Sequence, residues 1–313
     1  MKIVTVGLDI AKQTFQAHGV DCKGKVVLRK RMRRAEVSTF FAEVEPCLIG
    51  LEASGGAHYW FRVLSRLGHT VRLIAPQFVK PYVKSQKNDA NDAEAICEAV
   101  SRPSMRFVPA KKMEQQDLQC LHRVRSRLIG CRTQLVNQIR GLLAEYGIVL
   151  PQHVAQLRRH LPALLEDDGN ELTLSTRHLF HSLYEELVEL DAKIGSADQR
   201  IERAFRENAE CQRIAAVEGI GPVTATAVVA AISDGHAFRN GRQFAAWLGL
   251  VPRQHSSGGK TKLLGISNGA IPICARCWCM EPDQWSTVPR RRPTVGVGGS
   301  TTSNIDWEQQ ERA

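Results

Sequence analysis

The sequence lacks any apolar run long enough to cross a bilayer, and Asp9 interrupts its first apolar stretch too early for a secretory signal. It also lacks a regular cysteine framework in its first two-thirds. Its nine cysteines therefore predict reduced thiols of a cytosolic protein rather than a disulfide scaffold. Aromatic residues make up only 6%, but 313 residues that are 43% hydrophobic supply enough apolar material for the cores of about two domains.

Acidic residues are in deficit, with 32 Asp and Glu against 42 Lys and Arg. The resulting formal charge of +10 and pI of about 9.3 predict a polyanionic partner, either nucleic acid or an anionic membrane surface. Of the two, we favour nucleic acid. We therefore expect a soluble cytoplasmic protein, associated with the bacterial nucleoid and without a membrane partner.

The N-terminal third alternates short apolar runs with helical spacing. Residues 3–9 are β-branched and apolar, which predicts a buried strand that ends at a carboxylate. Two strands around the turn "DCKGK" follow, and then helices and strands alternate. The predicted order is β-β-β-α-β-α-β-α, which is the order of an α/β ribonuclease-H-like domain. The remaining expected elements are a helix at 36–44, a strand at 47–52, a helix at 59–68 and a strand at 70–76.

From Lys111 the pattern becomes helical. Apolar residues recur at steps of three and four from Leu118 to Leu142 and again from Leu183 to Ile201. This predicts two long amphipathic helices, separated by a stretch that contains Pro151 and Pro162, as an antiparallel coiled-coil insertion or a dimer seam. The first helix should expose five arginines, as either a solvated face or a phosphate-contacting face: Arg123, Arg125, Arg127, Arg132 and Arg140.

Residues 214–232 read as a helix, a "GIGP" turn and a second helix. The amides of Gly219 and Gly221 in such a turn can bind a phosphate, which favours a helix-hairpin-helix, although a plain corner between two helices would use the same glycines. A further helix should end at Gly249, followed by a loop rich in Ser, Gly and Lys.

Beyond Ser267 the hydrophobic period disappears, and we expect a disordered tail. Cys274, Cys277 and Cys279 are close in sequence, with His255 as a distant fourth candidate. A structural zinc site requires four ligands with paired spacing, so the cluster does not favour zinc.

Four carboxylates stand out. Asp89 and Asp92 are three residues apart at a predicted helix start, where acidic residues also suit the helix dipole. Asp9 and Glu52 end two strands that should be neighbours. Four carboxylates converging there would repel one another unless divalent cations neutralised them, and oxygen-only ligands favour Mg²⁺ or Mn²⁺. A two-metal site of this kind can cleave a phosphodiester.

The motifs "GLDIAK", "GLEASGG", "KNDANDAEAI", "VEGIGPVTA", "FAAWLGLVPRQHSSGGK" and "LLGIS" resemble the insertion-sequence one-ten family of DNA transposases over residues 2–267. The resemblance implies a RuvC-like N-terminal domain at 1–108, a helical coiled-coil region at 109–208 and a C-terminal transposase domain at 209–267. It assigns an Asp-Glu-Asp-Asp tetrad to Asp9, Glu52, Asp89 and Asp92. It also assigns a nucleophilic serine to the "RQHSSGG" loop, where the Ser-Gly step favours Ser257 over Ser256.

The activity implied by the resemblance is Mg²⁺-dependent strand cleavage and exchange through a transient phosphoserine. Its partners would be the DNA of the element ends and target, a structured guide RNA, and further copies of the chain through the coiled coil. Two alternatives stay open: a Holliday-junction-resolvase-like hydrolytic nuclease, and a catalytically inactive nucleic-acid-binding remnant. The residues assigned to nucleic-acid binding are Gly219, Gly221, Arg123, Arg127 and Lys260.

The sequence departs from the family after "GIS". Family members continue into "KRG"-like residues and a long Arg-containing helix, whereas this chain reads "NGAIPICARCWCMEP". We therefore expect a frameshifted or truncated C-terminus at 268–313, which puts the activity of this chain in question.

Overall fold

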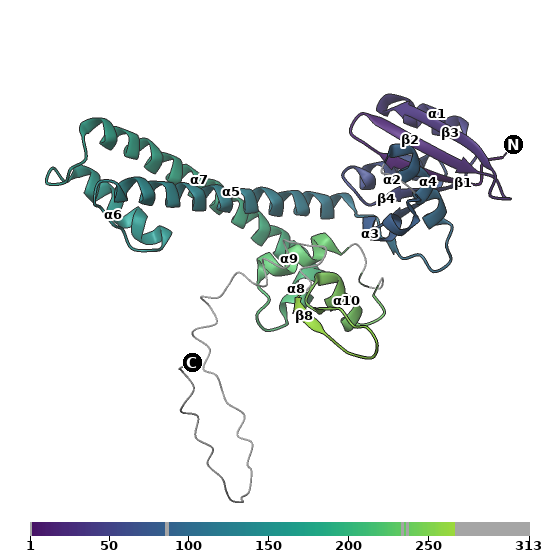
Figure 1. The fold of residues 1–313 in the computed structure, drawn as a ribbon. Coiled ribbons are helices and arrows are strands. Elements are labelled where there is room, and N and C mark those ends of the chain that lie inside the picture. The colour runs from purple at the N-terminus through teal and green to yellow at the C-terminus, as the bar shows by residue number, and fades with distance from the viewer. Residues whose placement is uncertain (1, 85–87, 233–234, 236–237, 267–313) are drawn as a thin grey trace, which may run out of the picture.

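The computed structural model describes residues 2–84, 88–232, 235 and 238–266. The expected disordered tail at 268–313 and the three clustered cysteines lie outside these residues. Figure 1 shows an N-terminal α/β unit (residues 2–108) at one end, a pair of long helices that leads away from it, and a C-terminal unit (residues 209–266) beside the end of that pair nearer the N-terminal unit. Among the described residues, no helix is both long and apolar enough to span a membrane.

A six-stranded sheet forms the N-terminal unit, in the order β3-β2-β1-β4-β5-β6. β1 pairs parallel with β4 and antiparallel with β2, because the first three strands form a meander and the later ones are reached through helices. The element order matches the prediction, except that the short helix Pro76–Val79 and the two-residue β6 were not expected. The strands are β1 Thr5–Ile10, β2 Thr14–Val20, β3 Val26–Arg33, β4 Leu48–Glu52, β5 Thr70–Ile74 and β6 Phe107–Val108.

Helices cover both faces of this sheet, so the unit has three layers. One core joins the sheet to α1 and α2 through residues such as Phe15, Phe41 and Trp60. The other face is covered by α4, whose Ile96 and Val100 form a second core with Val79. The helices are α1 Val37–Glu43, α2 Ala57–Arg66, α3 Pro76–Val79 and α4 Asp89–Val100, with short 3₁₀ turns at Arg34–Glu36 and Lys80–Tyr82.

Two glycines allow α4 to approach the sheet closely. Gly7 and Gly50 are partners in the β1–β4 register. A Cβ on Gly7 would overlap the Ala93 carbonyl and the Cys97 amide, and one on Gly50 would lie 2.8 Å from Cβ of Val100. The Cys97 thiol also donates to the carbonyl of Thr5. α4 therefore runs antiparallel to β1, with its N-terminus over the carboxyl end of that strand.

Two long helices, α5 Met113–Ala144 and α7 Leu174–Glu207, pack side by side in opposite directions (Figure 1). Their shared core includes Leu135, Ile139, Leu187 and Ile194. In the connection between these two helices the chain forms α6 Val154–Glu166. This helix was not predicted, because Pro162 lies inside it and proline usually ends a helix. Its buried Leu157 and Leu161 follow helical spacing and add to the same core.

The expectation of five exposed arginines on α5 is wrong for three of them. Arg125 and Arg132 form ion pairs with Asp198 and Asp191 of α7, and Arg140 donates to the carbonyl of Leu150. Arg125 and Arg132 thus join α5 to α7 and Arg140 ties α5 to the connection that follows it, while Arg123 and Arg127 are exposed.

The C-terminal unit docks on α5 and α7 through α9. Gln115 of α5 donates to the carbonyls of Val229 and Ile232, and Nε2 of buried His122 lies 3.0 Å from the Thr226 hydroxyl. The expected Ser-Gly-Lys loop is present and connects two short strands, which were not expected, into a β-hairpin. The elements are α8 Ala209–Ala215, α9 Pro222–Ala231, α10 Gly241–Leu248, β7 Pro252–Gln254 and β8 Leu263–Ile266.

Candidate functional site

Asp9 and Glu52 lie at the carboxyl ends of two adjacent parallel strands. Leu8 pairs with Leu51, so the next residue of each strand, Asp9 and Glu52, lies on the adjacent step. Both are two residues beyond the Gly7–Gly50 pair and therefore share the α4 face, because side chains alternate along a strand. The sheet register brings these two carboxylates together.

Asp89 and Asp92 lie in the first turn of α4. Asn88 caps this helix: its side chain accepts a hydrogen bond of 2.8 Å from the amide of Asn91. The acidic pair therefore suits the positive end of the helix dipole, as the simpler explanation expected. Because that end lies over the carboxyl end of β1, the same two carboxylates also face Asp9.

The electrostatics of Asp9 record this convergence. Burial of the carboxyl and the nearby charges of Asp89, Asp92 and Glu52 raise the pKa of Asp9 from 3.8 to about 6. A hydrogen bond from the Ile10 amide opposes this rise only in part. A carboxylate surrounded by three others binds a proton or a cation readily, since either one relieves the repulsion.

The donor atoms of this site suit a divalent metal, but the distances between its side chains are longer than those of a ready metal site. All four side chains offer carboxylate oxygens, the donors that Mg²⁺ and Mn²⁺ prefer. Within the part of the chain that the structure describes, however, no three His, Cys, Asp or Glu side chains stand close enough to form a ready metal site. Charges act over longer distances than ligand bonds, so the raised pKa of Asp9 and the absence of tight spacing are compatible.

The two candidate serines lie near the tip of the β7–β8 hairpin, and their environments differ. The Ser256 hydroxyl accepts from Nε2 of Gln254 at 2.9 Å and from the amide of Lys262 at 3.3 Å. Ser257 begins the tight turn, in which the Lys260 amide donates to its carbonyl at 3.0 Å. Gly258 and Gly259 supply the positive φ angles of 55° and 76° that this turn requires.

The Ser257 hydroxyl makes no hydrogen bond to any described residue. The hairpin therefore fixes the Ser256 hydroxyl by hydrogen bonds and leaves the Ser257 hydroxyl exposed. This hairpin and the four carboxylates belong to separate units of the chain. In Figure 1 the strand β8 lies beside α10, well away from the N-terminal sheet. The structure thus places the four carboxylates at one end of the sheet, near enough for their charges to act on Asp9, and leaves both serines apart from them.

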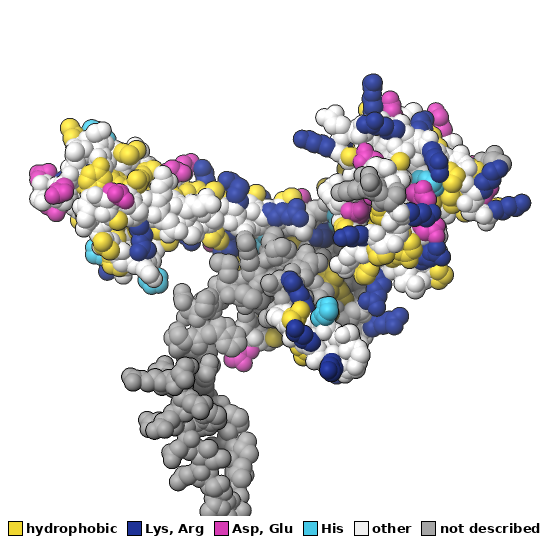
Figure 2. Space-filling model, in the orientation of Figure 1, with side chains coloured by type: hydrophobic (Ala, Val, Ile, Leu, Met, Phe, Trp, Pro, Cys, Tyr) yellow, Lys and Arg dark blue, Asp and Glu magenta, His cyan; other side chains and the backbone are white. Residues whose placement is uncertain are grey.

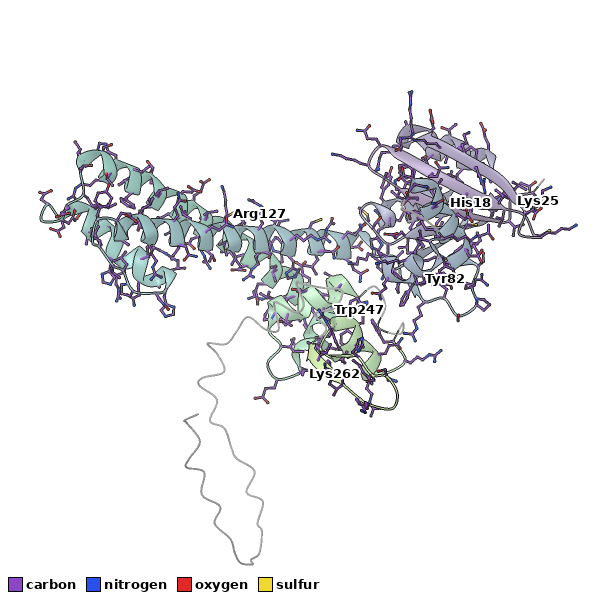
Figure 3. The ribbon with its side chains drawn as sticks, viewed as in Figure 1. His18, Lys25, Tyr82, Arg127, Trp247 and Lys262 are labelled. Carbon is purple, nitrogen blue, oxygen red and sulfur yellow. The ribbon has the colours of Figure 1, made fainter. Side chains whose placement is uncertain are left out.

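The residues assigned to nucleic-acid binding are spread over two units. Gly219 has a φ of 86° in the turn before α9, and Gly221 is the N-cap of that helix, with open space beside both. Arg127 projects from the middle of α5, and Lys262 marks the hairpin that also carries exposed Lys260 (Figure 3).

The sequence analysis did not single out Gly7 and Gly50, which let α4 reach the sheet. A glycine inside an apolar strand indicates close backbone approach, and this signal was present in "VGLD" and "IGLE".

Comparisons with known proteins decide the family. A transposase model named for the DEDD transposase of IS110 matches residues 6–148, and a second, described as "Transposase IS116/IS110/IS902 family", matches residues 211–276. The chain belongs to the IS110 family of transposases. Membership in this family of insertion-element transposases implies an enzyme that binds, cleaves and recombines DNA, and it suggests dependence on a divalent metal.

Similar proteins from several bacteria agree with this assignment. The chain is 53% identical over 268 residues to "Probable family 20 transposase" of Pseudomonas aeruginosa, covering 85% of this chain and 79% of that protein. It is 45% identical to the transposase for insertion sequence element IS1111A of Coxiella burnetii, covering 85% and 73%. It is 40% identical to the transposase for IS1328 of Yersinia enterocolitica, covering 85% and 78%.

Proposed function

We propose that this IS110-family transposase cuts and joins DNA with a divalent-metal carboxylate site in its N-terminal unit and a serine nucleophile on its C-terminal hairpin. The observation that carries the proposal is the position of Asp9, a half-buried carboxyl with Asp89, Asp92 and Glu52 near it; burial first, and then these three charges, raise the pKa of Asp9 to about 6. Such a concentration of negative charge is costly in a protein that binds DNA, unless cations are to be held there.

The four carboxylates would hold Mg²⁺ or Mn²⁺. When bound, the metal would neutralise the attacked phosphate and stabilise the leaving oxygen. Asp9 and Glu52 are fixed by the sheet, whereas Asp89 and Asp92 are carried by α4. Small side-chain movements of the α4 pair would therefore complete the ligand set on a rigid base.

Ser257 would act as the nucleophile. Its oxygen attacks the phosphorus, its proton passes to a base or water, and the bond from phosphorus to the 3′-oxygen breaks. The 3′-oxygen takes up a proton, which leaves a phosphoserine and a free 3′-hydroxyl. A 3′-hydroxyl from another strand then attacks the phosphoserine, which restores the diester and releases Ser257.

The separation of Ser257 from the carboxylates supports an assembly of several copies. Either the units of one chain must rearrange, or the hairpin of one copy must serve the carboxylates of another. The helix pair exposes large apolar residues along its length, including Val124, Leu142, Leu179 and Val188, which suits contact between copies through a coiled coil. The net charge of +10 suits the additional binding of a guide RNA. We retain residues 1–108, 109–208 and 209–267 as the domain division.

A second candidate is hydrolysis by the carboxylate site alone. The same separation favours it, because water can reach the carboxylates without any rearrangement. This chain would then act as a Holliday-junction-resolvase-like nuclease, and Ser257 would have no chemical role.

One experiment separates these functions. The protein is incubated with end-labelled DNA of an element end, a candidate guide RNA and Mg²⁺, and the products are resolved on denaturing gels. We expect a protein-linked DNA band that disappears in Ser257→Ala and remains in Ser256→Ala. Nicked DNA without a protein link in both variants would support hydrolysis. Binding without cleavage would overturn the enzymatic proposal and support an inactive DNA-binding protein.

A further inference from the structure

β3 is an edge strand with basic side chains on both faces. Its sequence, "VVLRKRMR", alternates arginines with other residues. Met32 is buried in the core beneath α1 and α2, and the Lys30 ammonium lies 4.3 Å from the ring centre of Phe40 in α1. Because side chains alternate along a strand, the arginines project from the opposite face, which is the one that carries α4. These are Arg29, Arg31 and Arg33, and all three are exposed.

This arginine row is in register with the carboxylate site. Arg31 pairs with Gln16 across β2, and Gln16 pairs with Asp9 of β1. Directly opposed residues share a face, so Arg31 and Asp9 project from the same side of the sheet. They are two strand spacings apart, about 10 Å. Arg33 lies one step further toward the carboxylate end of the sheet.

The surroundings of Arg29 support this placement independently. Arg29 pairs with His18 of β2, and His18 pairs with Gly7 of β1, which lies directly under α4. Burial lowers the pKa of His18 and a hydrogen bond from Lys84 lowers the pKa of Glu94 on α4; the positive charge of Arg29 adds a smaller lowering to both. An arginine on the other face would be separated from Glu94 by the sheet.

α4 leaves this row uncovered. The helix packs mainly on β1, β2 and β4, and β3 is the edge strand beyond them. Within the described part of the chain, none of the three arginines forms an ion pair. Figure 2 shows Lys and Arg side chains projecting from the outer rim of the N-terminal unit.

We propose that Arg29, Arg31 and Arg33 form a phosphate-binding track that guides the DNA strand to be cut toward Asp9 and its neighbouring carboxylates. This inference rests on the proposed function and extends it to a binding surface. Alternate residues of a strand are about 6.7 Å apart. That is twice the axial spacing of about 3.4 Å between phosphates in one strand of B-DNA. The row of three arginines is therefore long enough to contact several phosphates of a DNA strand that runs along β3. The occupant is DNA because the row continues into the site where the DNA phosphodiester would be cut.

A simpler explanation is available for charge on this strand. Edge strands often carry Lys and Arg to prevent pairing with other sheets. In that case the arginines on the α4 face and the lysines elsewhere on the same hairpin would contribute equally to DNA binding. The two explanations can be separated, because the same hairpin carries three lysines away from the arginine row: Lys23 and Lys25 in the turn at the far end of the sheet, and Lys30 on the opposite face. Figure 3 shows Lys25 at the outer tip of the sheet.

The test compares two triple variants of the full chain that lose the same charge. One carries Arg29→Gln, Arg31→Gln and Arg33→Gln, and the other carries Lys23→Gln, Lys25→Gln and Lys30→Gln. Binding of labelled element-end DNA is measured in EDTA at salt concentrations from about 50 to about 300 mM. Each lost phosphate contact should lower the salt slope by about 0.7 for a single strand and 0.9 for a duplex. We expect the arginine variant to lose about 2–3 units of slope and the lysine variant less than about 1.

Three further readouts make the result decisive. Circular dichroism melting shows whether each variant is folded, and Arg31→Gln alone should lose about 0.7–0.9 of a unit if the triple variant is unstable. Mn²⁺ binding followed by electron paramagnetic resonance should be unchanged in the arginine variant, which separates failure of the track from failure of the metal site. Equal slopes in the two triple variants would overturn the track. Loss of binding to a structured RNA with unchanged DNA binding would also overturn it, and would assign the row to RNA.

Discussion

Replacing Asp9 with asparagine should stabilise the metal-free protein at pH 7.5. Burial and the charges of Asp89, Asp92 and Glu52 raise the pKa of Asp9 from 3.8 to about 6. The folded state therefore binds more protons than the unfolded state between these pH values. The stabilising contribution of Asp9 is complete below pH 3.8 and is lost as the pH rises through 6. At pH 7.5 the ionised group destabilises the fold by up to about 3 kcal/mol, which asparagine removes.

Scanning calorimetry in EDTA tests this magnitude. For a unit of roughly 100 residues, 1 kcal/mol shifts Tm by about 4–8 °C, so Asp9→Asn should raise the transition of the N-terminal unit by at least about 4 °C. The difference from wild type should shrink as the pH falls from 7.5 to 4.5. Asp168→Asn is the matched control, because this exposed aspartate lies in the connection between α6 and α7. A lower Tm for Asp9→Asn in EDTA at pH 7.5 would refute the argument that the four carboxylates repel one another.

Three other perturbations follow from the structure. Gly7→Ala should displace α4 and cost more than about 1–3 kcal/mol of stability together with cleavage activity, whereas Gly55→Ala, where a Cβ meets open space, should do neither in the same melting and nicking assays. Burial, followed by a nearby arginine, lowers the pKa of His122 to about 4, so docking of the C-terminal unit on α5 should weaken as the pH falls from 6.5 to 4; limited proteolysis should show this loss, and His122→Gln should flatten it. Ser256→Ala should weaken the hairpin by about 1 kcal/mol and keep the protein–DNA link that Ser257→Ala loses, as gels would show.

The order of strands and helices in the N-terminal unit could be predicted because each element carries its own signal. β1 and β4 are short apolar runs that stop at Asp9 and Glu52, and parallel strands that stop together place such residues side by side. The helix that begins at Asp89 follows a capping residue. Local patterns therefore sufficed to predict the strand ends and the helix start that carry these four carboxylates, whereas their role as one site stays a prediction.

Other features depend on contacts that no local pattern records. Pro162 indicates a break, yet the packing of Leu157 and Leu161 outweighs it and α6 continues through the proline. The β7–β8 hairpin was missed because its first strand is exposed at every residue and shows no alternation. The partners of Arg125 and Arg132 lie more than fifty residues away on α7, so the sequence could not distinguish them from the exposed Arg127.

The most direct test of the central claim is a count of Mn²⁺ ions bound at pH 7.5, measured by electron paramagnetic resonance on the full chain. The claim is that Asp9, Glu52, Asp89 and Asp92 form one metal site. Wild type and Asp168→Asn should bind Mn²⁺ with the same stoichiometry, and Asp9→Asn and Asp92→Asn should each lose it while remaining folded. Mn²⁺ bound equally by wild type and by both site variants would show that these carboxylates do not form the metal site.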